Sequence, residues 1–159
     1  MQWGQLVSLQ INTEISGMLT LVIQTVINRI DIALLRDDIL LAHESWVSEK
    51  DEVKKVVPAL ESVFKKSGFV WADLSQIVVV VGKGNFSSTR IGVTIGNILG
   101  MATEAQIFEL EMEGDFDLGK LLECVENKFK EGWEPSPLAK PVYRSEPMIS
   151  PSKKKNFTN

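Results

Sequence analysis

The residues of this chain that come closest to a chemical motif are Gly82-Lys83-Gly84, a turn that follows the apolar run Ile77–Val81. The pair Ser87-Ser88 comes next and begins a pattern typical of a helix, which either serine could cap. Glycines between a strand and a helix let a ligand or another backbone approach closely. The N–H groups at a helix N-terminus can hold an anion such as phosphate. The spacing therefore predicts either a phosphate-binding loop or a tight turn that packs only on its own chain.

Other catalytic and metal-binding patterns are missing from the sequence. The turn is neither the Walker loop GxxxxGK[ST] nor the dinucleotide motif GxGxxG, because the third glycine falls too late. The chain has one His and one Cys, so HxxxH and CxxC metal motifs are excluded, and it has no GxSxG nucleophile turn. We therefore expect a binding module with no cofactor and no metal, and not an enzyme.

Strands and helices alternate around this turn in an order that predicts the fold. Three apolar runs joined by short turns indicate an antiparallel meander. Helices and single strands then follow in turn, as in a parallel sheet with helical crossovers. The order βββ-α-β-α-β-α is typical of the ribonuclease H-like layout, which is also one lobe of the actin-like ATPase fold. The predicted strands are 18–26, 29–37, 39–47, 76–81 and 105–111, and the predicted helices are 51–66, 88–101 and 117–131.

Each of the first two predicted helices has one face that is suited to pack against another element. The first has a continuous apolar stripe from Val53 to Phe64, and Gly68 should end it. Ser48 or Asp51 could cap its start. The second has a glycine every fourth residue, at 92, 96 and 100, which flattens one side for close approach. The neighbour is either the chain's own sheet or another protein.

Charge and composition limit the partners and the location. Residues 135–159 hold five basic residues and one acidic residue, whereas the other 134 residues hold 12 basic and 20 acidic ones. An acidic body with a basic tail argues against a general nucleic-acid binder, although the tail could touch phosphate. No apolar run approaches the roughly 18 residues of a membrane helix. A secretory signal begins with basic residues, and this chain has none before Arg29. The lone Cys124 fits a reducing cytoplasm, where we expect the protein.

Several segments, taken in order, resemble the TsaB (YeaZ) family of tRNA threonylcarbamoyladenosine (t6A) biosynthesis proteins. Residues 82–92, GKGNFSSTRIG, match the family motif GPGSFTGLRIG at six of its eleven positions. Ala33-Leu34-Leu35 matches the end of the family's second strand, and Val56-Val57-Pro58 matches a Leu-Leu-Pro step in its first helix. Tyr143-Arg144 with Lys153-Lys154-Lys155 is similar to its C-terminal segment. The resemblance covers residues 18–112 and 139–155. Among the departures from the family, Gln24 replaces an aspartate, Lys83 a proline and Ser88 a glycine.

The resemblance implies a non-catalytic scaffold that heterodimerises with the TsaD-type transferase of t6A modification. It implies a TsaE-type ATPase in a larger assembly, indirect contact with tRNA, and a possible homodimer when the partner is absent. Two helices of the first lobe would form the contact, with Gly82, Gly84 and Arg90 building the structural turn and Arg90 bonding neighbouring carbonyls. The expected partner-binding residues are Val53, Val56, Val57 and Leu60 on the first helix and Ile91, Gly92, Ile95, Gly96 and Leu99 on the second.

The alternative is a small nucleotide-binding kinase or carbamoyltransferase of the actin-like fold that uses residues 82–89 to hold phosphate. Gln24 argues against this alternative. In active relatives of the fold, the aspartate at this position would be the carboxylate that binds the metal ion of a nucleotide, and glutamine lacks that charge. We expect four segments: an N-terminal extension (1–17), the actin-like lobe (18–112), a residual helix of a truncated second lobe (113–133) and an extended basic tail (134–159). Either Met1 or Met18 could be the true start.

Overall fold

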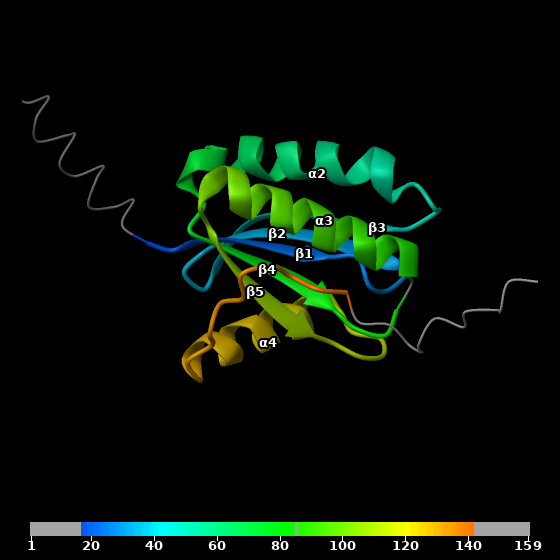
Figure 1. Cartoon of the computed structure of the whole chain (residues 1–159). Helices are drawn as coiled ribbons and strands as arrows, with labels where there is room; N and C mark the ends of the chain where they lie inside the picture. The colour runs from blue at the N-terminus through cyan, green and yellow to red at the C-terminus, as the bar shows by residue number, and fades with distance from the viewer. Residues whose placement is uncertain (1–16, 85, 142–159) are drawn as a thin grey trace, which may run out of the picture.

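The computed structural model describes residues 17–84 and 86–141, and of Phe86 only the backbone. A five-stranded sheet of order β3-β2-β1-β4-β5 forms its centre (Figure 1). β1, β2 and β3 pair antiparallel, and β4 and β5 continue the sheet parallel to β1. The predicted layout is therefore confirmed. The elements are β1 (Leu19–Gln24), β2 (Arg29–Arg36), β3 (Ile39–Val47), α2 (Glu52–Ser67), η1 (Trp71–Asp73), β4 (Gln76–Val81), α3 (Phe86–Thr103), β5 (Gln106–Glu111) and α4 (Leu118–Lys130).

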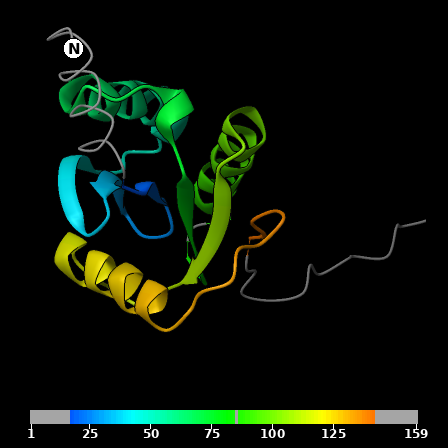
Figure 2. The same cartoon turned by 90° about the vertical axis from the view of Figure 1, so that its left-hand side faces the viewer.

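Helices cover both faces of this sheet. α2 and α3 lie over one face and α4 lies over the other (Figures 1 and 2). The side chains of β4 alternate accordingly: Ile77 and Val79 belong to the core under α2 and α3, whereas Val78 and Val80 belong to the core under α4. Strands buried on both faces read as continuous apolar runs, which explains the run that precedes the glycine turn.

The glycine row of α3 faces the chain's own sheet. A Cβ atom added at Gly92 would lie 2.4 Å from Thr25 Oγ1, and one at Gly96 would lie 2.4 Å from Val79 Cγ2. At Gly100 it would meet Ile107 Cδ1 at 2.6 Å. The expectation that a partner helix lies against these glycines is therefore wrong. They bring α3 close to the sheet, and a side chain at any of them would push the helix away from it.

The boundaries of α2 and α3 differ in part from the predicted ones. α2 ends as predicted: Gly68 adopts the left-handed conformation (φ 77°) and its N–H donates to the Phe64 carbonyl. Asp51 is the N-cap residue, one of the two predicted, but its side chain makes no capping hydrogen bond and pairs with Lys55 at 2.6 Å. The Ser48 hydroxyl donates to Glu52 instead of capping the helix. α3 begins at residue 86, so both predicted capping serines lie inside its first turn.

The described part of the tail runs along the β5 edge of the sheet. Ser136 forms a β-bridge with Ile107, and the Asn97 side chain exchanges two hydrogen bonds with the backbone of buried Ala139. The Lys140 N–H donates to Glu109 Oε1 at 2.5 Å. The rest of the tail, with Arg144 and its lysines, lies outside the described residues, as does the extension up to residue 16. Within the described ranges, no helix is long and apolar enough to cross a membrane.

Candidate functional site

The glycine turn lies at the carboxyl ends of the parallel strands β1, β4 and β5. The backbone segments that follow β1 and β5 pack closely against it. A Cβ atom added at Gly84 would lie 2.0 Å from the Val26 carbonyl oxygen, and one at Gly82 would lie 2.1 Å from the Met112 carbonyl oxygen. The Gly84 N–H donates to the Gly82 carbonyl at 3.0 Å. Both glycines therefore have a packing role that needs no ligand. The arrangement favours the tight turn over the phosphate loop.

A buried carboxylate lies at the first turn of α3. Glu52, from the start of α2, accepts hydrogen bonds from the hydroxyls of Ser48 and Ser88, the latter at 2.7 Å. Thr25 Oγ1 donates to the Ser88 carbonyl at 2.6 Å, which ties β1 to the same point. Burial alone would raise the pKa of Glu52, but the two serine hydrogen bonds lower it below its ordinary value. A negative charge held here disfavours phosphate at this helix N-terminus.

We expect Glu52→Gln to lower the free energy of unfolding by about 1 kcal/mol, because two charge-assisted hydrogen bonds become neutral ones. Urea denaturation at pH 7 measures the change. Glu61→Gln on the exposed side of α2 is the matched control and should leave stability unchanged. Equal losses in the two variants would contradict the role of Glu52 as the link between α2 and α3.

Gln24, at the position of the family aspartate, holds the β1–β2 turn. Its Oε1 accepts from the N–H of Val26 (2.6 Å) and of Ile27 (3.3 Å), and its Nε2 donates to the Arg29 carbonyl (2.7 Å) and to Asp31 Oδ2 (3.0 Å). The side chain is fully buried. All of its hydrogen-bonding groups are engaged within the chain, so the position has a structural role here.

Asp31 is the charged centre of the same network. It is 1% exposed and accepts hydrogen bonds from Arg29 Nε and Nη2, Ser45 Oγ and Gln24 Nε2. Burial raises the pKa of Asp31, but the hydrogen bonds from Arg29, Ser45 and Gln24 outweigh it, and the pKa lies below its ordinary value. Among the described residues, no group of three or more His, Cys, Asp or Glu side chains is placed to hold a metal ion.

The predicted partner-binding residues divide into buried and exposed ones. Val56 and Leu60 are 0% and 2% exposed, in the core under α2, so they cannot contact a partner on this surface. Gly92 and Gly96 are likewise excluded by their position on the sheet. Their spacing is correct for one helix face, but that face is the inner one. The remaining predicted residues, Val53, Val57, Ile91, Ile95 and Leu99, are exposed or half-buried, and their role stays a prediction.

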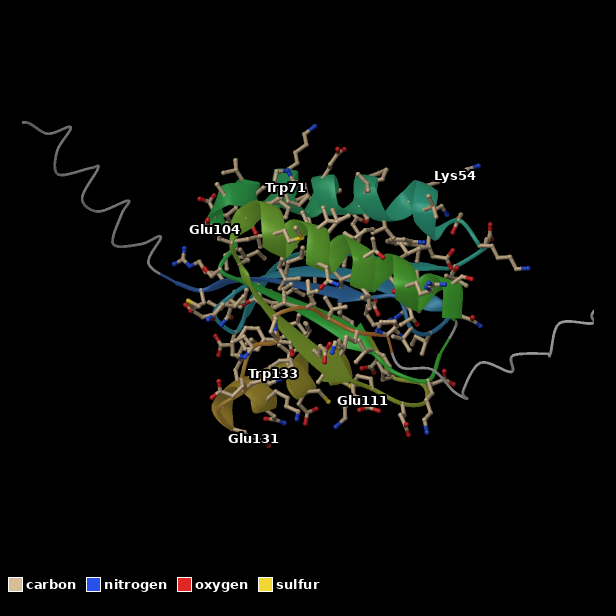
Figure 3. The ribbon with its side chains drawn as sticks, in the orientation of Figure 1. Lys54, Trp71, Glu104, Glu111, Glu131 and Trp133 are labelled. Atoms are coloured by element: carbon tan, nitrogen blue, oxygen red, sulfur yellow. The ribbon has the colours of Figure 1, made fainter. Side chains whose placement is uncertain are left out.

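Three exposed apolar residues near them did not enter the sequence prediction. Val70, Ile98 and Met101 are 59%, 58% and 77% exposed. Ile98 continues the spacing of Ile91 and Ile95 along α3, a second stripe that the glycine row obscured. Trp71 of η1 and Glu104 beyond α3 lie at the same end of the helix pair, and Lys54 lies at the other end (Figure 3). We call the exposed set Val53, Val57, Val70, Ile98 and Met101 the α2–α3 surface.

The predicted role of Arg90 stays a prediction. Its side chain is exposed on the first part of α3. Beside the turn, a hollow of about 370 Å³ is lined by the turn, the β1–β2 connection and the loop after β5. Lys83 and Asp115, of opposite charge, both line it. This pairing is poorly suited to a polyphosphate, which needs a concentration of cations and N–H donors.

The strand order and the helices on both faces define a ribonuclease H-like lobe of the actin-like ATPase kind. Comparisons with known proteins narrow this class. The tRNA threonylcarbamoyladenosine biosynthesis protein TsaB of Bacillus subtilis (strain 168) is 33% identical over 90 residues, which are 57% of this chain and 39% of that protein. The resemblance to the TsaB (YeaZ) family is therefore confirmed. No family model matches the chain.

Two solved structures share the fold. YeaZ from Pseudomonas aeruginosa aligns with a TM-score of 0.56 and 17% identity, over 59% of this chain and 44% of that one. A protein described as similar to peptidase YeaZ from Pseudomonas aeruginosa aligns with a TM-score of 0.57 and 17% identity, over 72% of this chain and 49% of that one. The chain spans less than half the length of each of these relatives.

Proposed function

We propose that this protein is a non-catalytic subunit that pairs with a TsaD-type transferase in the t6A modification of tRNA. The curated relative that it resembles is named as a t6A biosynthesis protein. At the carboxyl edge of the sheet, where active relatives of the fold would hold a nucleotide, Gln24 and the glycine turn are engaged in contacts within the chain. These features support binding rather than catalysis.

The observation that carries the proposal is the α2–α3 surface. Its five residues are half of the ten large apolar side chains that stand exposed in the described part of the chain. α2 and α3 lie on the same face of the sheet, and η1 contacts α3. The five residues therefore stand on one side of the sheet, spread along the helix pair, and a partner that lies along both helices would cover them. A specific complex needs about 800 Å² from each partner, an area that two adjacent helices can supply.

The proposal includes the wider assembly that the resemblance implies. A TsaE-type ATPase joins the pair, contact with tRNA is indirect and passes through the transferase, and the complex works in the cytoplasm. The same surface forms a homodimer when the transferase is absent. All of these partners depend on the first contact, so that contact is the one to test.

Val57→Asp combined with Ile98→Asp is expected to weaken binding of the TsaD-type paralogue from the same genome about 100-fold. Each change places a charge in an apolar contact, and two such contacts at about 1.4 kcal/mol each give this factor. Isothermal titration calorimetry measures it. Both side chains are exposed, so the fold should be kept.

The control is Val47→Asp, the same kind of change on β3, where Val47 is 70% exposed. It should bind like the wild type. Equal binding by all three proteins, or no binding by the wild type, would refute the proposed contact. Gly96→Leu is unsuitable for this test, because it would displace α3 from Val79 and report on folding.

A further inference from the structure

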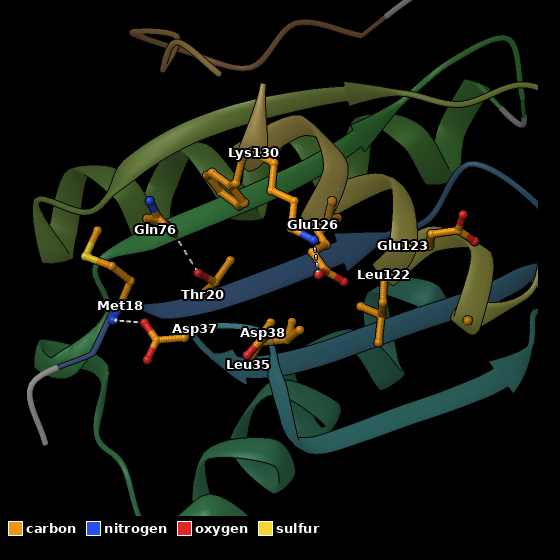
Figure 4. Close-up of a pocket in the computed structure, with 13 residues that line it drawn as sticks. Met18, Thr20, Leu35, Asp37, Asp38, Gln76, Leu122, Glu123, Glu126 and Lys130 are labelled. Atoms are coloured by element: carbon orange, nitrogen blue, oxygen red, sulfur yellow. Dashed lines mark hydrogen bonds and ion pairs between the residues drawn. The ribbon is translucent and has the colours of Figure 1, made fainter. Parts of the chain in front are cut away.

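A hollow of about 700 Å³ lies between α4 and the sheet, on the face opposite the α2–α3 surface (Figure 4). The start of β1, the end of β2 and the start of β4 form one wall, and α4 forms the other. The aromatic cluster of Phe108, Phe129 and Trp133, with ring centroids 5.0–5.1 Å apart, holds the last turn of α4 against β5. Because β5 and β2 are separated by two strands, the side of α4 that faces β2 leaves this hollow between helix and sheet.

The floor of this hollow is mainly apolar. Leu35 and Val125 are buried at its base, Leu122 and Phe129 are half-buried, and Met18 is 44% exposed at its mouth. Two polar residues interrupt the floor where β1 and β4 begin: the Thr20 hydroxyl donates to Gln76 Oε1 at 2.8 Å. A hollow of this size with half-buried apolar walls has the properties of a binding site, since apolar surface left near water gains free energy when it is covered.

The rim of the hollow is acidic. Asp37 and Asp38 stand on the β2–β3 turn, and Glu123 and Glu126 stand on α4 (Figure 4). Lys130 is the single basic residue among those that line it, and it pairs with Glu126 at 2.7 Å. With four carboxylates and one ammonium group, the lining residues carry a formal charge of −3. Phosphate, nucleic acid and anionic lipid are therefore repelled here, and a cation is attracted.

We propose that this hollow binds a short segment of a partner protein in which lysine or arginine side chains flank apolar ones. The apolar residues of such a segment would cover Leu122, Phe129 and Met18. Its cations would lie near Asp38 and Glu123, at the two sides of the mouth. An apolar core with a charged rim is also the usual plan of a protein–protein contact.

This site does not depend on the proposed t6A function. The hollow and the α2–α3 surface lie on opposite faces of the sheet, so both can be occupied at once (Figure 2). A failure at one surface leaves the other unaffected.

Fluorescence anisotropy with a labelled helical peptide of four lysines and four leucines tests the proposal on the full chain. We expect the wild type to bind this peptide at least tenfold more tightly than a Glu/Leu peptide or a Lys/Ser peptide of the same length. Asp38→Lys with Glu123→Lys should weaken binding at least tenfold. Both residues are exposed, so these changes should leave the fold intact, which circular dichroism checks.

The matched control is Glu49→Lys with Glu61→Lys, an equal change in net charge on exposed residues outside the hollow. This variant should bind only about twofold to threefold more weakly than the wild type, because its changed net charge weakens the long-range attraction of the basic peptide. Equal weakening in the two double variants would overturn the proposal, as would failure of the wild type to bind. Binding that appears only after Lys153, Lys154 and Lys155 are changed to glutamate would instead assign the hollow to the chain's own tail.

Discussion

Gly84→Ala is expected to lower the free energy of unfolding by about 3 kcal/mol, a large effect for the addition of one methyl group. The new Cβ would lie 2.0 Å from the Val26 carbonyl oxygen and 2.4 Å from Val26 Cγ1. Val26 cannot move away easily, because its N–H is held by Gln24 Oε1 at 2.6 Å. The turn after β4 and the turn after β1 would have to separate. Urea denaturation followed by circular dichroism measures the loss.

The control for this prediction is Gly119→Ala on α4. A Cβ atom at Gly119 would find Asp117 Oδ1 as its nearest neighbour, at 3.4 Å, which is an ordinary contact. Alanine is the better helix former by about 1 kcal/mol, so this variant should be as stable as the wild type or more so. If Gly84→Ala proved as stable as the wild type, the close backbone contact at the glycine turn would be wrong.

The strands and their order could be predicted because their signal is local. An apolar run such as 77–81, bounded by turn residues, shows its type within a few positions. The end of α2 was equally clear, since Gly68 supplies the left-handed residue that terminates a helix. Helix starts were less clear: Ser48 and Ser88 looked like caps, yet both hydroxyls donate to the buried carboxylate of Glu52. The contact between Ser88 and Glu52 joins residues 36 positions apart, which no local pattern reveals.

The residues of the proposed partner surface could be predicted only in part from the sequence, because spacing defines a helix face but not what covers it. The apolar stripe with Val56 and Leu60 and the glycine row with Gly96 are the faces with the strongest patterns. The helix faces with the strongest apolar or small-residue pattern are the ones that pack into the chain's own core. Val53 and Val57 remain exposed, as the prediction needs, whereas the exposed Ile98 and Met101 did not stand out as a separate face until the inner face of α3 was known.

The hydrogen-bonding role of Gln24 also could not be predicted from the sequence. Its difference from the family aspartate predicted a loss of chemistry, but not what the amide would do instead. The structure uses both ends of the amide at once, as acceptor for Val26 and Ile27 and as donor to Asp31. An aspartate at this position is shorter and carries no donor, so it could not make the same bonds.

Arg29→Met is expected to lower the free energy of unfolding at pH 7 by about 3 kcal/mol, because it leaves the buried charge of Asp31 without its counter-ion. Arg29 Nη2 lies 2.9 Å from Asp31 Oδ2, and the Asp31 side chain is 1% exposed. Methionine keeps most of the volume of the arginine stem, so the loss reports on charge rather than on packing. Arg36→Met at the other end of β2 is the matched control and should cost less than 1 kcal/mol.

The pH dependence separates this explanation from a simple loss of contacts. In the wild type the folded pKa of Asp31 lies below its ordinary value of 3.8, so its stabilisation is complete above that pH and is lost as pH falls through the folded value. In Arg29→Met, the hydrogen bonds and charge of Arg29 no longer lower the pKa of Asp31. The effect of burial then dominates, and this pKa should rise above its ordinary value. Protonation then relieves the buried charge, so the gap between variant and wild type should narrow from pH 7 to pH 4. A gap of constant size over this range, measured by urea denaturation, would show that the Asp31 charge is not the cause.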